Sequence, residues 1–413
     1  MAELVPFKAL RPQKQYVQAV ASPPYDVVNR EEAKNSVAGN PLSFLHVEKS
    51  EIDLPDDVVA PAHAIYGRAK SNLDKLIRDG VLFQEKKPSL YIYAQERQGC
   101  RQFGIVGGIS VREYEQGKIK KHELTREDKE LDRTRHVDTV NAHTGPVFVT
   151  YRARPAIDQL VADVMAGPAD YEFIADDQVT HAVWTIGDED KVNVIIEEFV
   201  AIDNLYIADG HHRAAAAAAV AKLRRSKNPL VEKAEYEHML AVLFPHTQLQ
   251  IMDYNRVVRD LRGLTAAEFL AACAKDFIVS GAFQEKSPRC VHEFGMYLNG
   301  CWYKLAARAG TYDDAHPIGR LDVSILQERL LAPVLAVHDP RTDQRIAFVG
   351  GIRGMQELER LVDEQKFAVA FAMYPPTMEQ LLAVADTDRV MPPKSTWFEP
   401  KLRSGIFTHL LVS

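Results

Sequence analysis

The chain has 413 residues, of which 46% are hydrophobic and 26% charged, and its formal net charge is −7. This composition is typical of a globular protein and excludes a disordered chain, which combines low hydrophobicity with high net charge. The negative charge disfavours nucleic acid as a partner, because neutralising phosphates requires a basic surface. The length favours two or three domains, and we place a boundary near residue 230, between an α/β region 1–230 and a second α/β region 231–413.

The sequence has no run of about 18 apolar residues, so we expect no contact with a membrane interior. Its first ten residues lack the basic and apolar blocks of a signal peptide, which predicts a cytoplasmic protein. The four cysteines form no C-x-x-C pair and fit no common zinc framework, and we expect reduced thiols. The oligomeric state stays open, a homo-oligomer included.

In the first region, hydrophobic spacing and strand-forming residues predict alternating helices and strands. The charged stretch 118–135 is assigned neither a helix nor a strand. In chain order we expect a helix over 62–80, strands over 90–93 and 103–111 with a hairpin at Gln98-Gly99, a strand over 147–151, a helix over 156–166, a strand over 181–186, a helix over 191–199 and a strand over 205–208.

The second region continues this alternation. Strands and helices that follow one another in this way predict a mixed α/β or α+β class. We expect strands over 238–244, 346–350 and 368–373, helices over 265–277, 321–331, 357–364 and 377–385, and a proline-bounded tail over 391–398.

The residues that carry chemistry follow the predicted strand 205–208. Asp209-Gly210 turns the chain, and an alanine-rich helix over 214–225 begins near His212. The first amides of a helix have no internal partners and lie at the positive end of the helix dipole, which makes an anion site. Gly210 allows close approach of a ligand, Arg213 adds a two-pronged phosphate contact, and His211 and His212 add donors.

Asp209 is the one acceptor in this group, and it can cap the helix, hold a metal or take a proton from a hydroxyl. The alternative is that Asp-Gly is only a turn and that both histidines lie on the surface. A His-His-Arg sequence at a helix start is unfavourable in like charge unless an anion binds there. We therefore favour the functional interpretation of residues 209–213.

The segment 206–213 resembles the phosphate-binding motif of the ParB/sulfiredoxin superfamily, in which a strand, a glycine turn and a helix hold nucleotide phosphates. Within it, the chain is similar to the family of domain-of-unknown-function 1015 (DUF1015). The resemblance implies a ParB/sulfiredoxin-like core with an additional α/β domain. It rests on five blocks in this order: Pro23–Val27, Lys121–Glu123, Asn141–Phe148, Asp209–Arg213 and Pro392–Thr396.

This superfamily includes free-serine kinases with a similar Asp-Gly-His motif, so the resemblance implies phosphoryl transfer to a small hydroxylated metabolite. It also includes nucleotide-dependent DNA-binding clamps. Sulfiredoxins need a cysteine in the motif, where this chain has His211 after Gly210. That departure argues against sulfiredoxin chemistry.

Two further blocks offer candidate substrate contacts. His122-Glu123 can supply a carboxylate that orients or deprotonates a hydroxyl or holds magnesium, and a solvated charged loop is an equal alternative. Asn141 and His143 stand before a Gly-Pro turn, where asparagine often bonds only its own backbone. Functional and structural interpretations of this pair are equally favoured.

The remaining two blocks lie near the ends of the chain. Tyr25-Asp26 follows two prolines, and a rigid turn with a capping aspartate is slightly favoured over substrate binding. Lys394-Ser395-Thr396 joins a cation to two hydroxyls and can make a secondary phosphate contact. It lacks the glycine-rich loop of a P-loop, and a tail strapped onto the domain is an equal alternative.

The sequence therefore predicts a small-molecule phosphotransferase with ATP, ADP or pyrophosphate as donor and free serine as the first candidate acceptor. We expect Mg²⁺, with Asp209 as its candidate ligand, because magnesium usually bridges transferring phosphates. Charge on the transferring group would be stabilised by His211, His212, Arg213 and Lys394, with Asp209 or Glu123 as the base. The alternative is a nucleotide-binding sensor without metabolite turnover. A nucleic-acid module is the least favoured, since the basic cluster 222–227 is typical of a solvated helix end.

Overall fold

The computed structural model describes residues 2–55, 61–227 and 234–412. The chain forms two compact units, Met1–Leu249 with Pro400–Ser413, and Gln250–Glu399. The boundary expected near residue 230 falls in 228–233, outside the described residues. The division between the compact units differs from that expectation, because the strand His238–Pro245 pairs within the sheet of the first unit and the C-terminal segment returns to it.

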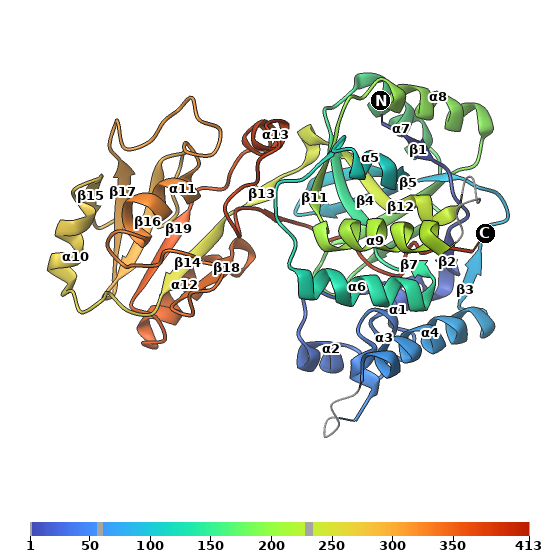
Figure 1. Cartoon of the computed structure of the whole chain (residues 1–413), viewed down its shortest axis with the longest axis horizontal. Coiled ribbons are helices and arrows are strands. Elements are labelled where there is room, and N and C mark those ends of the chain that lie inside the picture. The colour runs from blue at the N-terminus through green and yellow to red at the C-terminus, as the bar shows by residue number, and fades with distance from the viewer. Residues whose placement is uncertain (1, 56–60, 228–233, 413) are drawn as a thin grey trace. The chain divides into compact units, whose positions relative to one another are not determined.

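The first unit is built on a large mixed sheet (Figure 1). Its described strands are β1 (Leu4–Val5), β4 (Leu90–Arg97), β5 (Cys100–Ser110), β6 (Ile119–Lys120), β8 (Val147–Tyr151), β9 (Tyr171–Ile174), β10 (Thr180–Ile186), β11 (Leu205–Asp209) and β12 (His238–Pro245). They lie in the order β6, β11, β8, β12, β5, β4, β10, β9, with β1 also paired to β5. Two small ladders join β2 (Leu10–Pro12) to β3 (Leu82–Gln84) and β7 (Ala142–His143) to β21 (His409–Leu410).

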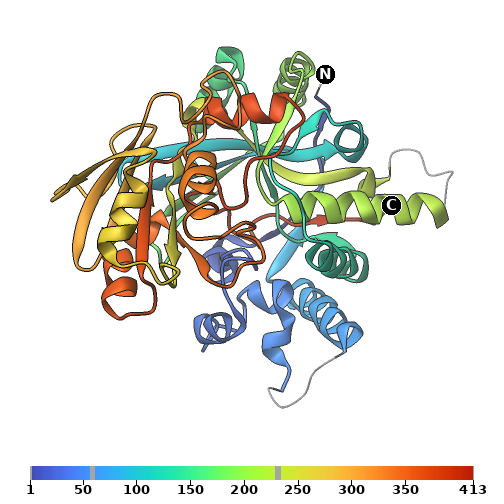
Figure 2. The same cartoon turned by 60° about the vertical axis from the view of Figure 1, so that its left-hand side comes forward.

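Helices cover this sheet. The described helices of the first unit are α1 (Val17–Val20), α2 (Arg30–Ser36), α3 (Leu45–Glu48), α4 (Ala62–Arg78), α5 (Val111–Glu115), α6 (Glu127–Val140), α7 (Pro155–Met165), α8 (Glu189–Val200) and α9 (His211–Lys227). Helices α6 and α9 lie side by side (Figures 1 and 2). The alanines of α9 bring its backbone close to the sheet, and Ala214, Ala217 and Ala221 belong to the core beneath it.

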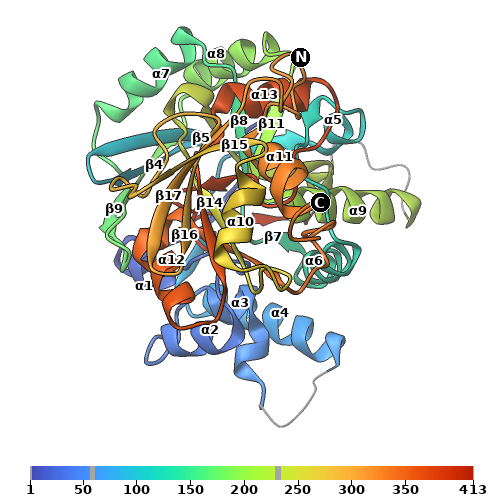
Figure 3. The same cartoon turned by 90° about the vertical axis from the view of Figure 1, so that its left-hand side faces the viewer.

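The second unit has its own six-stranded sheet, in the order β15, β17, β16, β19, β14, β18. Its strands are β13 (Ile251–Met252), β14 (Tyr254–Val258), β15 (Phe277–Gly281), β16 (Glu293–Leu298), β17 (Cys301–Ala307), β18 (Ile346–Gly350), β19 (Val369–Met373) and β20 (Trp397–Phe398), with β13 and β20 forming a separate pair. Its helices are α10 (Ala266–Cys273), α11 (Asp322–Leu326), α12 (Gly354–Asp363) and α13 (Met378–Asp386). Helix α10 packs on β15, and α12 packs on β16 and β19 (Figure 3).

The mixed α/β class is confirmed, and every predicted helix and strand has a counterpart of the same type. The main differences are elements that the sequence pattern does not predict. The strands β14, β15, β16 and β17 make up four of the six strands in the second sheet, and α6 occupies the end of the charged stretch 118–135 and extends to Val140. Its buried face includes Arg133 and His136 beside only two large apolar residues, Val137 and Val140, so its hydrophobic spacing is weak. Within the described residues, no helix combines the length and apolar character needed to cross a bilayer.

Candidate functional site

The centre of the site is the Asp-Gly turn, residues 209–213, between β11 and α9. The pairing of β11 with β8 shifts register between Ile207 and Asp209, and such a bulge re-aims the side chain that follows it. Gly210 then takes a left-handed φ of +89°, which favours glycine. Its carbonyl accepts the Ala214 amide at 3.0 Å, so the amides of residues 211–213 form the open start of the helix.

Arg213 is held in one direction by groups from three segments. One Nη donates to the carbonyl of Pro146, and the other lies 3.4 Å from Asp26 Oδ2 and 3.9 Å from Asp209 Oδ2. Burial alone would lower the pKa of the guanidinium, but Asp26 and Asp209 outweigh it and raise the pKa. The side chain is only 10% exposed, so a fixed positive charge stands beside the helix start.

Asp209 carries the negative charge of the turn. Burial raises the pKa of its carboxyl, but Lys401 and Arg213 outweigh burial and lower the pKa to about 2. Lys401 Nζ lies 3.5 Å from Asp209 Oδ2 and comes from the C-terminal segment of the first unit. The carboxylate is therefore ionised at neutral pH and has two cations for neighbours.

His211 and His122 form a buried pair. Their rings meet edge to face with centroids 4.5 Å apart, and His211 Nε2 accepts the His122 amide at 3.5 Å. Burial lowers the pKa of His122 to about 4 and places that of His211 well below its ordinary value. Because the His211 ring is buried against His122, we assign it to positioning the chain rather than to the phosphate contact expected from the sequence.

His212 is half-buried, and its Nε2 accepts the Arg126 amide at 3.0 Å. Burial lowers its pKa, although Asp26 opposes the shift. The neutral ring therefore carries its proton on Nδ1. Together the two histidines accept amides from both ends of the segment 122–126, which anchors this segment, with Glu123 inside it, against the start of α9.

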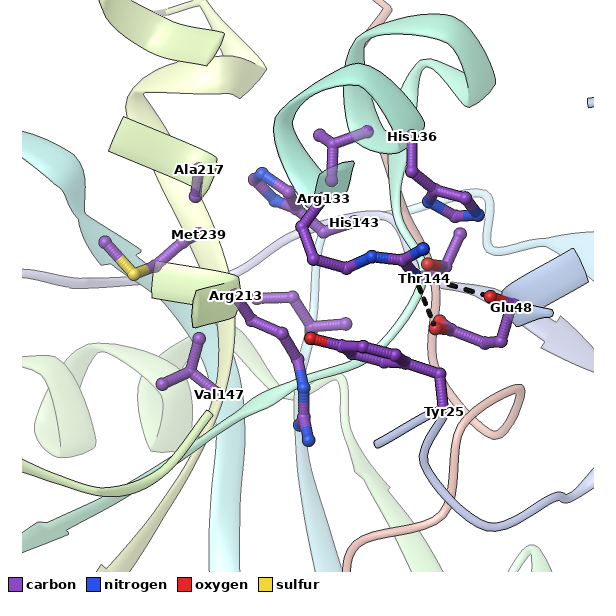
Figure 4. Close-up of a pocket in the computed structure, with 13 residues that line it drawn as sticks. Tyr25, Glu48, Arg133, His136, His143, Thr144, Val147, Arg213, Ala217 and Met239 are labelled. Carbon is purple, nitrogen blue, oxygen red and sulfur yellow. Dashed lines mark hydrogen bonds and ion pairs between the residues drawn. The ribbon is translucent and has the colours of Figure 1, made fainter. Parts of the chain in front are cut away.

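A small cavity lies beside Arg213 (Figure 4). It offers about 20 Å³ to the centres of water-sized molecules, which is room for about one water. Its polar lining comes from segments far apart in the sequence. The principal polar residues are Tyr25, Glu48, Arg133, His143, Thr144 and Arg213.

Arg133 organises one side of this cavity. Its guanidinium lies 4.2 Å from the centre of the Tyr25 ring, and its Nη1 lies 3.6 Å from Glu48 Oε2. The same Nη1 donates to the Glu48 carbonyl at 3.4 Å. Burial and the charge of Asp26 raise the pKa of Tyr25, although Arg133 opposes them, so the phenol is neutral. The candidate substrate contacts Tyr25, Asp26 and His143 thus lie in or beside the same site as Arg213.

One expected residue of the first unit is not brought to the turn. Asn141 ends α6 with a left-handed φ of 61°, and its side chain accepts Arg224 Nη1 at 2.7 Å, three turns along α9 from Arg213. Lys394, Ser395 and Thr396 belong to the second unit. There the Lys394 carbonyl accepts Arg256 Nη2 at 2.9 Å, and the Ser395 hydroxyl donates to the Pro392 carbonyl at 2.6 Å.

Three groups of the candidate site are not predicted from the sequence. Glu48 ends the short, mostly apolar stretch 44–48, and a buried carboxylate there could have been noticed. Arg133 is hidden among the many charges of 118–135, and Lys401 lies almost 200 residues from Asp209, so neither carries a local signal.

Among the described residues, no group of three or more His, Cys, Asp or Glu side chains is arranged to hold a metal ion. At the turn, Asp209 and Asp26 both lie against the Arg213 guanidinium. One or two carboxylates fit a magnesium ion that arrives with its phosphates, which supply most of the other ligands. They do not fit a metal held by protein groups alone.

Comparison with solved structures gives three examples of distant similarity. A free serine kinase in complex with AMP is 13% identical with a TM-score of 0.36, covering 71% of this chain and 86% of that chain. A conserved hypothetical protein from Pyrococcus furiosus is 12% identical with a TM-score of 0.35, covering 71% and 90%. SbnI with a C-terminal truncation, from Staphylococcus aureus, is 11% identical with a TM-score of 0.38, covering 71% and 82%.

No curated protein matches the chain. A family model described as a protein of unknown function, DUF1015, matches residues 4–324. The match spans four of the five blocks on which the sequence resemblance to this family rests, those around Tyr25, His122, His143 and the Asp-Gly turn, and the fifth block, Pro392–Thr396, lies outside it. It covers most of the chain, and the protein therefore belongs to the DUF1015 family.

Proposed function

We propose that this protein is a small-molecule phosphotransferase. It binds the phosphates of a nucleotide or polyphosphate at the Asp-Gly turn and passes a phosphoryl group to the hydroxyl of a small metabolite, with free serine as the first candidate. The observation that carries the proposal is Arg213, a buried guanidinium fixed beside the open amides of α9. A guanidinium held beside the free amides of a helix start can bind the negatively charged oxygens of a phosphate together with those amides.

Catalysis of phosphoryl transfer depends mainly on positioning the reacting groups and on stabilising the charge on the transferring group. Arg213 and the amides of residues 211–213 provide this at the turn. Lys401 adds a second cation 3.5 Å from Asp209, and the His212 Nδ1–H adds a donor. Groups that are already held in place stabilise a developing charge without reorganising, which is what lowers the barrier.

The hydroxyl of the acceptor must also be oriented. Asp209 stays ionised at neutral pH and can accept its hydrogen bond, and Glu123 in the anchored segment 122–126 is the second candidate. Magnesium, when bound with the donor, would neutralise phosphate charge, and Asp209 is the residue that would hold it. ATP, ADP and pyrophosphate are the candidate donors.

A nucleotide-binding sensor is the second candidate. It is favoured by the close match of charges at the turn, where the Arg213 and Lys401 cations face the Asp26 and Asp209 carboxylates. An incoming phosphate would compete with these carboxylates for the cations and so would rearrange the segments that carry them. Such a protein would bind a nucleotide tightly and release no phosphorylated product.

Phosphorus NMR tests the proposal, with the purified protein, magnesium, free serine and each of the three donors in turn. We expect a new phosphomonoester signal that is lost in Arg213→Ala and kept in Arg224→Ala, which removes an arginine from the far end of the same helix. Nucleotide binding that depends on Arg213 without any new signal would favour the sensor. Binding that is unchanged in Arg213→Ala would contradict both.

A further inference from the structure

The cavity beside Arg213 contains an unsatisfied carboxylate. Glu48 is only 3% exposed, and while its Oε2 faces Arg133 at 3.6 Å, its Oε1 has no hydrogen-bond partner among the described residues. A buried charged oxygen without a donor is unfavourable, because it has lost its hydrogen bonds to water and no protein hydrogen bond replaces them. A donor that the chain itself does not supply is therefore expected at this atom.

Gly145 shows where that donor would lie. A Cβ added to it would stand 3.2 Å from the Ser404 hydroxyl, 3.4 Å from Glu48 Oε1 and 3.7 Å from Arg213 Cδ. The Ser404 hydroxyl lies at this point without donating to Glu48 Oε1, which has no hydrogen-bond partner among the described residues. The carboxylate oxygen and the stem of the arginine thus face one small space, which the missing side chain of Gly145 leaves open. Room for about one water-sized group limits the occupant to a single polar atom and its hydrogens.

The charges around the space identify this group. Two guanidinium groups, of Arg133 and Arg213, line the cavity together with the one carboxylate of Glu48, so a further cation is disfavoured. His143 also lines it, with both ring nitrogens buried and unpartnered among the described residues, and burial holds its pKa well below the ordinary value. A neutral imidazole offers one donor and one acceptor. A neutral hydroxyl, which donates to Glu48 and can also accept, matches this lining.

We infer that this cavity binds the hydroxyl of the phosphoryl acceptor and that Glu48 Oε1 accepts its hydrogen bond, an inference that rests on the proposed function. On transfer the O–H bond breaks and its proton passes to Glu48. The hydroxyl oxygen then forms the new bond to the phosphorus of the nucleotide or polyphosphate. The bond from that phosphorus to the bridging oxygen breaks, and the leaving phosphate keeps the electron pair. Glu48, rather than Asp209 or Glu123, is then the proton acceptor.

Calorimetric binding to paired ligands tests the hydroxyl site without requiring turnover. The pairs are serine and alanine, threonine and 2-aminobutyrate, and glycolate and acetate, which differ by one hydroxyl. In the wild type we expect the hydroxylated member of at least one pair to bind about tenfold tighter or more, since a site built to pair with a hydroxyl rejects the analogue without it. Gly145→Ala, whose added carbon fills the space, is expected to abolish this preference. Gly67→Ala, with nothing within 4 Å of the added carbon, is the control.

Absence of any hydroxyl preference in the wild type, or a preference kept in Gly145→Ala, would overturn the inference. Glu48→Gln tests the proton step, and we expect its transfer rate to fall about 100-fold or more while nucleotide binding is kept. Glu51→Gln, three residues along the chain and partly exposed, should transfer normally. If the wild type transfers a phosphoryl group and both Glu48→Gln and Gly145→Ala transfer it equally well, the proposed function stands and the role of Glu48 is refuted. A hydroxyl preference lost in Gly145→Ala without any phosphorylated product would support the cavity and refute the proposed function.

Discussion

At the scale of single residues, the turn is a compact set of paired charges. Arg213 bridges Asp26 and Asp209, and Lys401 approaches Asp209 from the C-terminal segment. The Asp209 carboxylate stays charged because two cations stand beside it, and the Arg213 guanidinium is held in direction by the two carboxylates. The turn therefore has an electrostatic contribution to folding as well as the role in binding that we propose.

Asp209 makes this contribution measurable. Its pKa is about 2 in the folded protein against about 3.9 when unfolded, so the stabilisation is present above pH 4 and is lost as pH falls through 2. We expect Asp209→Asn to lower the free energy of unfolding by about 1–2 kcal/mol at pH 7, discounted for a side chain that is 30% exposed.

Chemical denaturation at pH 7, 4 and 2 measures this difference. The curves of the wild type and Asp209→Asn should approach each other at the lowest pH. Asp203→Asn, at an exposed position shortly before β11, should leave the free energy of unfolding unchanged. An equal deficit of Asp209→Asn at all three values would mean that packing, not charge, stabilises this position.

At the scale of elements, the site is an assembly of one strand–turn–helix with loops that it anchors. His211 and His212 accept the amides of His122 and Arg126, so the helix start holds the segment 122–126 through two hydrogen bonds. Glu123 lies within this segment, and its position therefore depends on the histidines of the turn. His122 is buried at one end of the segment, whereas the Leu124 side chain is 63% exposed. The His212 bond to the Arg126 amide therefore matters most for the exposed end of the segment.

We expect His212→Ala to loosen the segment without unfolding the protein. Loss of one acceptor removes about 1 kcal/mol, which corresponds to about fivefold faster hydrogen exchange at the Arg126 amide. Amide exchange followed by NMR measures it. His63→Ala, at an exposed position in α4, serves as the control. Unchanged exchange at Arg126 would show that the segment is held by other contacts.

Sequence reasoning predicted elements better than it predicted the site. The strand 147–151 is a local run of strand-forming residues, and the turn at Asp209 is an Asp-Gly pair that directly follows the apolar run 205–208. The structure has both elements. The contacts that complete the site are non-local. Lys401 meets Asp209 only because the chain returns to the first unit, and Glu48 faces Arg213 only because α3 and the turn fold together. No spacing within a segment encodes such contacts.

At the scale of the whole molecule, each unit carries buried groups whose pKa is shifted chiefly by burial, histidines in the first unit and Asp322 in the second. In the first unit, five buried histidines have lowered pKa values, chiefly because burial disfavours the charged ring. They are His122 and His136 at about 4, His181 at about 3, and His143 and His211 well below the ordinary value. In the second unit, burial raises the pKa of Asp322 to about 7, although the His292 amide opposes it.

These shifts give the units opposite pH dependence. A histidine with a lowered folded pKa binds its proton more readily when unfolded, so the stability of the first unit falls as pH drops from about 6.5 toward 4. Asp322 binds its proton more readily when folded, so its contribution to the second unit grows as pH drops from about 7 toward 4.

Hydrogen exchange with mass spectrometry at pH 7 and pH 5, corrected for the intrinsic rates, separates the two units in the intact chain. We expect the strands of the first unit to lose protection at pH 5, by a change of about 1 kcal/mol or more, while those of the second unit keep or gain it. Asp322→Asn, which stays neutral at both values, should weaken the response of the second unit, where burial also raises the pKa of Asp253, and should leave that of the first unchanged. A parallel loss of protection in β5 and β16 would instead show that the units unfold as one cooperative body, because only then would the buried histidines of the first unit set the acid stability of both.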